Sequence, residues 1–341
     1  MLPALDELLT SAHVVALPLP TRFRGIDVRE AMLLRGPQGW TEFSPFTEYD
    51  DAEAAAWLAA AIDFGWTPTP PVLREAVHVN ATLPVVAPER VPDVLARFPG
   101  CRTVKVKVAD PGSTLPEDAA RVAAVRAFLG PEGRIRVDAN GAWSVDAAER
   151  AIHAFAEHDL EYVEQPCATV PELAELRRRI KHMGVPVAAD ESVRKASDPL
   201  AVARAGAADL LVIKAQPLGG VHAALRIVAE AGLPVVVSSA LDTSVGISMG
   251  LHLAATVPEL DFDCGLATVA LLADDITEQP LLPVEGMLPV RRVVPSESLL
   301  RRHAASPERT QWWRERLERC WAVLSQTGLS HTRSQPFKES S

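Results

Sequence analysis

Residues 134–164 read RIRVDANGAWSVDAAERAIHAFAEHDLEYVE, and this stretch decides how the chain folds. It begins with the alternating segment Arg134–Asp138 and ends with Leu160–Glu164, and both segments have the length and pattern of short strands. The alanine-rich residues between them have the composition of an amphipathic helix. A strand, a helix and a second strand in this order predict one βα unit followed by the start of the next.

The same rhythm continues on both sides, from about Val77 to Leu266. Successive strands begin roughly 24 to 31 residues apart, which leaves room for one helix and two loops. The predicted strands are Val77–Ala81, Thr103–Val108, Arg134–Asp138, Leu160–Glu164, Val185–Asp190, Asp209–Lys214, Leu233–Ser238 and Phe262–Gly265. Eight such strands favour a closed barrel over an open doubly wound sheet, since the GxGxxG turn of nucleotide-binding sheets is absent.

Residues 1–75 have a different pattern and predict an α+β capping domain. Its expected elements are strands at Ala12–Leu17, Ala31–Leu34 and Trp40–Phe43 and a helix at Asp51–Phe64 that Asp50 can cap. The segment Pro18–Asp27 contains proline, glycine and three charged residues. We expect this segment to be a mobile loop that covers the substrate.

The rest of the chain divides into three further parts. We expect the barrel domain to span residues 76–270. Residues 271–325 include a predicted helix near Gln311–Leu324 and are expected to pack back toward the capping domain. Residues 326–341 form a polar tail that is expected to be disordered.

The bulk composition excludes several classes of protein. Of the 341 residues, 48% are hydrophobic and 23% are charged, and the net charge is −10. An acidic chain without a basic stripe argues against a nucleic-acid partner. No signal peptide and no apolar run of membrane-spanning length is present, so we expect a cytoplasmic protein without membrane contact. The four scattered cysteines predict reduced thiols, and a monomer and a homo-oligomer are equally compatible with these features.

Charged residues gather where the predicted strands end, which is where (β/α) barrels place their active sites. Along the chain these strand ends carry two lysines, then three acidic residues on successive strands, then a third lysine: Lys105, Lys107, Asp138, Glu164, Asp190 and Lys214. Strand alternation puts both members of the lysine pair on the face opposite the neighbouring valines, so they are expected to point into the barrel. By the same alternation Arg136 shares the face of Asp138.

Buried charges at these positions must neutralise one another or hold an ion, because an isolated buried charge is costly. The carboxylates Asp138, Glu164 and Asp190 form a hard oxygen site that suits Mg²⁺, with Mn²⁺ as a substitute. Such an ion acidifies the α-proton of a carboxylate substrate by stabilising the enediolate, and a lysine near other cations can act as the base. Glu161 faces away from Glu164 and is expected to be structural.

Four segments carry a resemblance to a known family: Gly39–Phe46 (GWTEFSPF), Val137–Trp143 (VDANGAW), Val163–Cys167 (VEQPC) and Val237–Gly246 (VSSALDTSVG). Through them the chain resembles the enolase superfamily, and in particular its muconate-lactonizing subgroup, which has a lysine on each side of the substrate. Within that subgroup the last segment is most similar to the o-succinylbenzoate synthases. A mandelate-racemase-like enzyme would carry a histidine where this chain has Ser238.

The resemblance implies a (β/α)7β TIM-like barrel with an amino-terminal α+β capping domain. It also implies a carbon–oxygen lyase that performs the Mg²⁺-dependent syn-dehydration of 2-succinyl-6-hydroxy-2,4-cyclohexadiene-1-carboxylate to 2-succinylbenzoate in menaquinone biosynthesis. Asp138, Glu164 and Asp190 would bind the metal.

The same resemblance implies roles for the remaining residues. Lys107 would remove the α-proton and return it to the departing hydroxyl, and Lys105 would lower the pKa of Lys107. Lys214 would stabilise the enediolate from the opposite face. The substrate carboxylates would be held by Arg136, Ser238, Ser239 and the backbone near Gly265.

Other interpretations stay open. An N-succinylamino-acid racemase needs two bases on opposite faces, and Lys107 with Lys214 would supply them equally well. A dipeptide epimerase would carry an Asp-x-Asp pattern on the last strand, which Asp261 and Asp263 match, although Asp261 also fits an ordinary turn. The alternative from a different class is a non-catalytic, metal-binding barrel.

Overall fold

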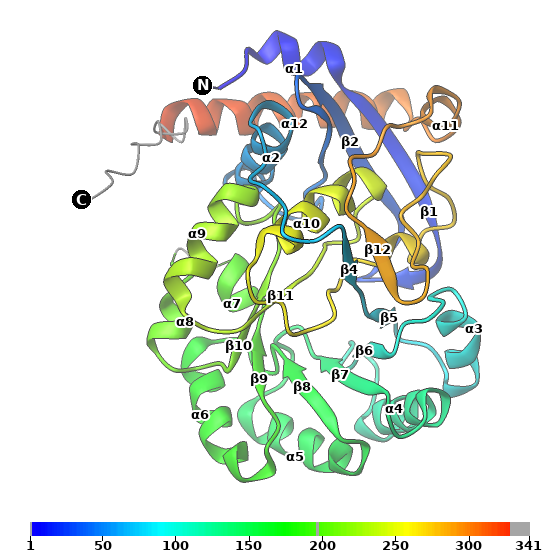
Figure 1. The fold of residues 1–341 in the computed structure, drawn as a ribbon, viewed down its shortest axis with the longest axis vertical. Helices are drawn as coiled ribbons and strands as arrows, with labels where there is room; N and C mark the ends of the chain where they lie inside the picture. Colours follow the sequence, from blue (N-terminus) through cyan, green and yellow to red (C-terminus); the bar gives the residue numbers. More distant parts are fainter. Residues whose placement is uncertain (1, 196–197, 328–341) are drawn as a thin grey trace.

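The computed structural model describes residues 2–195 and 198–327, and its parallel-stranded barrel is covered at one end by a smaller sheet (Figure 1). The predicted tail, 326–341, lies outside the described residues except for residues 326 and 327, which end helix α12 (Pro307–Thr327).

Seven parallel strands form the barrel sheet, in the order β11-β10-β9-β8-β7-β6-β5. Their bounds are β5 Ala81–Leu83, β6 Thr103–Lys107, β7 Arg134–Asp138, β8 Leu160–Glu164, β9 Val187–Ala189, β10 Leu210–Ile213 and β11 Val235–Val237. The sheet closes through Cys264, which bridges to Val79, and Gly265, which bridges to Ser238. The eighth predicted strand is therefore reduced to two bridges, but it completes the (β/α)7β barrel.

The predicted first strand, Val77–Ala81, is split in the structure. Ala76–His78 forms β4, which pairs antiparallel with β12 (Met287–Pro289) outside the barrel, and the barrel strand β5 begins only at Ala81. The alternation of side chains shows that a segment is extended but does not identify the neighbour with which it pairs. The other strands from β6 to β11 differ from their predictions only at the ends.

Helices surround the barrel: α3 Val91–Leu95, α4 Leu115–Leu129, α5 Val145–Phe155, α6 Val170–Ile180, α7 Glu191–Arg194, α8 Ala201–Arg204, α9 Val221–Ala231 and α10 Ser244–Thr256. Short 3-10 turns lie at η1 Pro88–Arg90, η2 Ala156–His158, η3 Lys181–Met183 and η4 Thr268–Leu271. Thr114 with Glu117, and Thr169 with Glu172, form capping boxes that satisfy otherwise unpaired N–H groups at the starts of α4 and α6. These caps fix where the strand-to-helix loops end.

The valines of the barrel strands face the helices, as the alternation predicts. Val104, Val106, Val137 and Val163 are fully or almost fully buried in one continuous core that reaches the surrounding helices. Burial contributes about 1.5–3 kcal/mol for each such side chain. Because this face is apolar, the charged residues between the valines point to the inside of the barrel.

The capping part consists of the antiparallel sheet β1 (His13–Phe23), β2 (Ile26–Gly36) and β3 (Gly39–Phe43) with helices α1 (Leu5–Ser11), α2 (Asp51–Trp66), α11 (Glu297–Arg302) and α12. Asp50 caps α2 as predicted, since its carboxylate accepts from the backbone N–H of Glu53. Helix α12 lies along this part, on the side away from the barrel (Figure 1), and Trp313 packs with Phe43 and Trp57 in a second core.

The segment Pro18–Asp27 is a β-hairpin, and the prediction of a loop was wrong. Strand β1 continues to Phe23 and β2 begins at Ile26, so only Arg24 and Gly25 make the turn, both with positive φ. Pairing is irregular between Pro18 and Phe23. Prolines suggested a loop here, but a hairpin edge accepts proline where no ladder N–H is needed.

Two expectations concern the chain as a whole. No helix within the described ranges is long and apolar enough to cross a membrane. All four cysteines are free thiols, as predicted.

Candidate active site

The charged strand ends meet at one end of the barrel and at one level. In the parallel ladder Lys107 lies opposite Asp138, and Asp138 lies opposite Glu164, so β6, β7 and β8 end together. Asp190 directly follows β9, and Lys214 directly follows β10. The three carboxylates are almost inaccessible to solvent. The structure therefore brings together the residues that were predicted as metal ligands and as catalytic lysines.

Each lysine donates a hydrogen bond to one carboxylate, and Lys105 Nζ also lies 3.5 Å from Asp138 Oδ2. The Nζ–O distances are 2.8 and 3.0 Å from Lys105 to Glu164, 2.5 Å from Lys107 to Asp138 and 2.5 Å from Lys214 to Asp190. Lys107 also donates to Asn140 Oδ1 at 2.8 Å. The inward charges neutralise one another, which is how buried charges become tolerable.

Strand order places two of the lysines on opposite sides of the barrel. Counting β5 as the first barrel strand, β6 is second and β10 is sixth of eight, because Cys264 and Gly265 supply the last position. Lys107 and Lys214 therefore face each other across the barrel, with the carboxylates of the three intervening strands between them.

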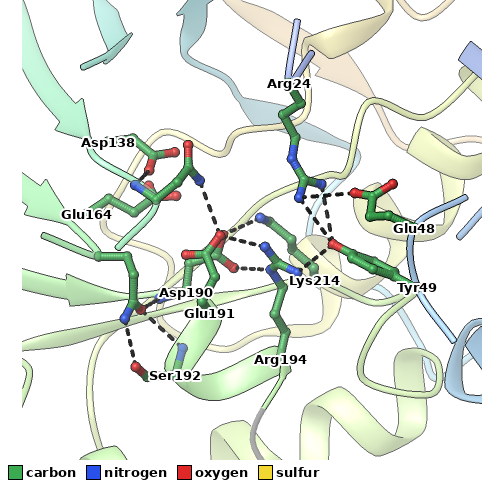
Figure 2. Close-up of polar contacts among 12 residues, drawn as sticks. Arg24, Glu48, Tyr49, Asp138, Glu164, Asp190, Glu191, Ser192, Arg194 and Lys214 are labelled. Atoms are coloured by element: carbon green, nitrogen blue, oxygen red, sulfur yellow. Dashed lines mark hydrogen bonds and ion pairs between the residues drawn. The ribbon is translucent and has the colours of Figure 1, made fainter. Parts of the chain in front are cut away.

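An arginine pair connects this set to the capping part (Figure 2). Arg194 donates to Asp190 Oδ1 at 3.0 Å, to Glu191 Oε1 at 2.6 Å and to the Tyr49 hydroxyl at 3.1 Å. From the other side, the Arg24 guanidinium lies 3.3 and 3.4 Å from the same hydroxyl. Tyr49 thus links the β1–β2 turn to Arg194, the last residue of helix α7, which follows β9.

Burial and the neighbouring charges shift the pKa values of the carboxylates in opposite directions. Burial, and then repulsion from Asp138, raise the pKa of Glu164 to about 7. Burial also acts to raise the pKa of Asp138, but the ammonium groups of Lys107 and Lys105 outweigh it and hold that pKa well below its usual range. For Asp190, Lys214 and Arg194 likewise outweigh burial and lower the pKa.

The lysine ammonium groups also differ. Burial favours the neutral form of Lys105, but Glu164 and Asp138 outweigh it and hold the pKa of Lys105 above its ordinary value. Burial lowers the pKa of Lys214, and attraction to Asp190 offsets this only in part. Lys105 is therefore a permanent cation, whereas Lys214 is more easily neutralised.

The donor set fits a hard divalent cation chemically. Asp138, Glu164 and Asp190 supply only carboxylate oxygens, which Mg²⁺ prefers. Their mutual repulsion is evident in the raised pKa of Glu164. Among the residues that the structure describes, no three acidic, histidine or cysteine side chains surround a common point. Each carboxylate instead holds an ammonium group, so a bound cation would have to compete with the lysines.

A cavity opens above these charges and is shared by the barrel and the capping part. Its lining residues are Phe23, Arg24, Phe46, Trp57, Thr82, Lys105, Lys107, Asn140, Arg194, Lys214, Pro217, Ser238, Ser239, Ala240, Leu241, Gly265 and Thr268. Ser239 donates to Gly265 O at 2.7 Å. A Cβ at Gly265 would lie 2.4 Å from Ser238 Oγ, so a larger residue there would displace the serine hydroxyl. Ser238, Ser239 and Gly265 therefore lie together in the wall of the cavity.

Arg136 is not among these lining residues, in contrast to the prediction that it binds substrate. Its side chain is completely buried and donates to Glu161 Oε2 at 2.5 Å, to Asn80 Oδ1 at 3.0 Å and to Asp263 O at 2.6 Å. Arg136 points into the barrel as expected, but two residues before the strand end, where these partners and not the cavity surround it.

Two family models match most of the chain. Residues 14–65 match the model "Enolase N-terminal domain-like" and residues 90–295 match "Enolase C-terminal domain-like". The o-succinylbenzoate synthase of Mycobacterium marinum is 56% identical over 94% of this chain and 96% of its own length. The chain belongs to the o-succinylbenzoate synthase family of the enolase superfamily. The enzymes of Mycolicibacterium smegmatis (55% identical, 94% and 98% covered) and Mycobacterium tuberculosis (54%, 95% and 98%) are similarly related.

Solved structures agree with the fold. The muconate lactonizing enzyme of Pseudomonas fluorescens, complexed with muconolactone, superposes with a TM-score of 0.74 at 20% identity, covering 86% of this chain and 98% of that one. The L-Ala-D/L-Glu epimerase of Bacillus subtilis gives 0.71 at 21% identity, covering 82% and 95%. The (β/α)7β barrel with its capping domain is thus the fold of this o-succinylbenzoate synthase family member.

Three residues of this synthase-family site were missed by the sequence reasoning. Arg24 and Arg194 line the cavity. Arg24 lies in the segment that was expected to cover the substrate, so its charge was a usable signal, but nothing in the sequence pairs it with Tyr49. Gln165 accepts from the backbone N–H groups of Asp190 at 3.0 Å and Ser192 at 3.1 Å, and it has a φ of 36°. It holds the backbone of a predicted metal ligand in place.

The Asp-x-Asp pattern that kept a dipeptide epimerase open does not reach the cavity. Asp261 is exposed. Asp263 accepts from Thr103 Oγ1 at 2.5 Å and from Arg134 Nη2 at 2.9 Å. Both partners begin strands β6 and β7, so this carboxylate lies at the amino end of the barrel, opposite the site.

Proposed function

We propose that this chain dehydrates 2-succinyl-6-hydroxy-2,4-cyclohexadiene-1-carboxylate to 2-succinylbenzoate, a step of menaquinone biosynthesis, and is thus a carbon–oxygen lyase. The observation that carries this proposal is the pair Lys107 and Lys214 on opposite sides of three buried carboxylates. The family membership supports the same reaction.

Lys107 is proposed as the base and then the acid. Its neutral amine takes the proton from the carbon next to the ring carboxylate, and the new ammonium returns a proton to the hydroxyl on the adjacent carbon. That hydroxyl leaves as water while the ring becomes aromatic. Proton and hydroxyl leave from one face in a syn elimination, so a single group can do both. Lys107 lines the cavity, as this role requires.

The other lysines are proposed to act through their charge. The pKa of Lys105 is held high by Glu164 and Asp138 after the effect of burial is offset, so Lys105 stays an ammonium group that can attract the substrate carboxylate. Lys214 faces the substrate from the opposite side and would stabilise the negative charge that develops on deprotonation. Ser238, Ser239 and the backbone of Gly265 are proposed to bind substrate; Arg136 is not.

Asp138, Glu164 and Asp190 are proposed to hold Mg²⁺, or Mn²⁺ in its place. The ion would stabilise negative charge on the substrate carboxylate and would compete with Lys107 and Lys214 for the carboxylate oxygens.

The charge balance of the site supports a dicarboxylate substrate. Four cations, Lys105, Lys107, Arg194 and Lys214, contact four carboxylates, Asp138, Glu164, Asp190 and Glu191. With all four cations protonated, the state before Lys107 acts as the base, a divalent cation alone would leave this set with an excess of two positive charges. The ring carboxylate and the succinyl carboxylate together supply two negative charges and restore neutrality.

The division of the chain is also proposed to follow the sequence prediction, with a capping domain at 1–75, a barrel domain at 76–270 and a returning segment at 271–325. The separate family matches to 14–65 and 90–295, and the packing of α12 on the capping core, support it. A cytoplasmic location and the lack of a nucleic-acid partner stay predictions from the composition.

The decisive experiment supplies the purified protein, loaded with Mg²⁺, with the cyclohexadiene substrate and follows 2-succinylbenzoate by chromatography. A second arm supplies each enantiomer of an N-succinylamino acid in deuterated water, because the opposed lysines would also serve a racemase. Fast dehydration supports the proposal. Poor dehydration, with each single lysine variant exchanging the proton of one enantiomer only, would establish racemisation instead.

A further inference from the structure

Two of the segments that carry the family resemblance lie far apart in the sequence but meet in the structure. Glu42, in Gly39–Phe46, reaches from strand β3 to Val237–Gly246, which leads from β11 into helix α10. One oxygen of Glu42, Oε2, accepts from the Thr243 hydroxyl at 2.5 Å and from the N–H groups of Thr243 at 3.2 Å and Gly246 at 3.1 Å. A carboxylate of the capping sheet thus caps a helix of the barrel.

Arg29 of strand β2 adds a second connection to the same loop. Its Nε donates to the carbonyl oxygen of Leu241 at 2.9 Å, and its Nη2 donates to Ser44 O at 2.5 Å. Asp242 lies 4.0 Å from this guanidinium. Arg29, Glu42 and Asp242 are all buried. The capping sheet therefore holds both the backbone carbonyl before Asp242 and the N–H groups after it.

The held loop forms one wall of the substrate cavity. Ser238, Ser239 and Leu241 line that cavity. Leu241 has a φ of 64°, a left-handed backbone conformation that a leucine adopts only when its surroundings fix it. The carbonyl that Arg29 holds belongs to this residue.

The packing at the centre of this contact leaves no spare room. A Cβ at Gly246 would lie 2.7 Å from Asp242 Cβ and 2.8 Å from Glu42 Cδ. Such contacts require the loop or the glutamate to move. Glycine at position 246 is thus needed for the capping carboxylate to reach the helix start.

We infer that Arg29 and Glu42 are positioning residues, which from the capping sheet fix the backbone of Leu241–Gly246 and so set the substrate-facing wall at Ser238 and Ser239. Neither touches the substrate. The inference rests on the proposed function only for the identity of the ligand. Its physical basis is that removal of the Glu42 acceptor leaves buried N–H groups unpaired, which the loop can relieve only by moving.

The first test replaces Glu42 with leucine, which keeps similar bulk but accepts no hydrogen bond. We expect KM, and the dissociation constant for 2-succinylbenzoate measured by calorimetry, to rise roughly tenfold, a scale set by the loss of buried hydrogen bonds. The value of kcat should change by no more than about threefold, since lysines and carboxylates on other strands are untouched. Hydrogen exchange of the Thr243 and Gly246 amides should accelerate at least tenfold.

Glu30→Leu is the matched control. Glu30 also lies on the capping sheet and accepts from Arg309 Nη2 at 2.6 Å and Trp313 Nε1 at 2.9 Å, but it ties the sheet to α12 and not to the cavity. Its loss should lower stability without changing exchange in the Leu241–Gly246 loop or the affinity for 2-succinylbenzoate. Glu42→Gln, which keeps one acceptor oxygen, should restore most of the affinity.

Gly246→Ala tests the same idea without removing a charge. It should slow substrate capture through KM and should accelerate loop exchange. If the wild type binds 2-succinylbenzoate and both variants leave loop exchange and affinity unchanged, or if Glu30→Leu changes them equally, the inference is wrong. If the wild type does not bind 2-succinylbenzoate, the proposed function fails, and faster loop exchange confined to the Glu42 and Gly246 variants would still support the positioning role. If Glu42→Leu does not fold, loop exchange and affinity measured on Gly246→Ala and Glu42→Gln test the inference.

Discussion

The barrel holds two layers of charge, one at the strand ends and one nearer the strand starts, and the two layers differ in their relation to the cavity. The upper layer, at the strand ends, joins Lys107 to Asp138 and Lys105 to Glu164 and borders the cavity. The lower layer joins Arg136 to Glu161 and Arg134 to Asp263 and has no part in the cavity lining. Arg136 of the lower layer and Asp138 of the upper layer lie on the same face of β7.

Depth along the strand, and not the face of the strand, separates the two layers. Arg136 lies two residues before Asp138, which places it about 6–7 Å deeper. There its guanidinium stacks over the Tyr162 ring at 4.8 Å, and the Asn80 side chain completes its surroundings. The Arg136 guanidinium is thus surrounded by protein groups, whereas the charged groups at the rim border the cavity.

The largest expected effect concerns the upper layer. Lys107→Ala should lower kcat by roughly two to four orders of magnitude, the usual scale for loss of a general acid–base group. Steady-state assays with saturating Mg²⁺ measure it, and Lys181→Ala, the loss of an exposed lysine, serves as the control. Activity within tenfold of the wild type would remove Lys107 from the role of base.

The lower layer should show the reverse pattern. Arg136→Met should destabilise the protein by about 3–5 kcal/mol, because it leaves Glu161 without its buried partner. The protein that remains folded should keep kcat and KM within about threefold of the wild type. Urea unfolding measures the first quantity and assays at low temperature the second. A large rise in KM at unchanged stability would return Arg136 to the substrate site.

Metal affinity should also distinguish the layers. Asp190→Asn removes one ligand charge and should weaken Mg²⁺ or Mn²⁺ binding at least roughly tenfold, and chelation of the wild type should abolish turnover until metal is restored. The lower-layer variant Asp263→Asn should leave the affinity unchanged. Calorimetry on metal-stripped protein measures these affinities. Unchanged affinity after Asp190→Asn would reassign the third ligand, with Glu191 the next carboxylate in the chain.

Charge balance predicts that metal and ligand bind cooperatively. The upper layer is neutral without ligands, so Mg²⁺ should bind roughly 5- to 150-fold more tightly when 2-succinylbenzoate is present. The affinity for 2-succinylbenzoate should rise by the same factor when the metal is present. Benzoate, which has one carboxylate, should give a smaller factor. Independent metal and dicarboxylate binding, measured by calorimetry in both orders, would argue against this charge balance.

The sequence predicted most of the upper layer because its members share one simple rule. A strand that ends in a charged residue, repeated on successive strands, identifies the rim whatever the exact strand bounds are, so Asp138, Glu164 and Lys214 were found without knowledge of their partners. Arg136 was misplaced because alternation reports the face of a strand and not the depth. The local sequence does not distinguish a charged residue at the strand end from one two positions earlier on the same face.

The capping part was harder to predict because its role depends on long-range contacts. The hairpin at Pro18–Asp27 was taken for a loop, and the link from Arg24 through Tyr49 to Arg194 joins three distant segments. Glu42 was quoted as part of a family segment, but its partners Thr243 and Gly246 lie about 200 residues later. Patterns of short period carry no information about such pairs.

The contact between the capping sheet and the barrel differs from the lower layer, because its buried charges do not balance. The lower layer sets two guanidinium groups against two carboxylates, but Glu42 and Asp242 share the single guanidinium of Arg29. Burial, and then repulsion from Asp242, raise the pKa of Glu42 to about 7, and the hydrogen bonds from Ser44 and Thr243 offset this only in part.

The smallest expected effect is the resulting dependence of stability on pH. Between the unfolded value near 4.5 and about 7, folded Glu42 keeps a proton that the unfolded chain has lost, so stability should fall as pH rises through this window and level off above it. Glu42→Gln cannot titrate. The stability of the wild type relative to this variant should therefore fall by on the order of 1–3 kcal/mol from pH 5 to pH 8 in urea unfolding with saturating Mg²⁺. For Glu30, the hydrogen bonds from Arg309 and Trp313 outweigh burial and lower the pKa. The difference in unfolding free energy between the wild type and Glu30→Gln should therefore not change from about pH 5 to pH 8. If the stability difference between the wild type and Glu42→Gln also did not change with pH, the surroundings of Glu42 would have to compensate its charge.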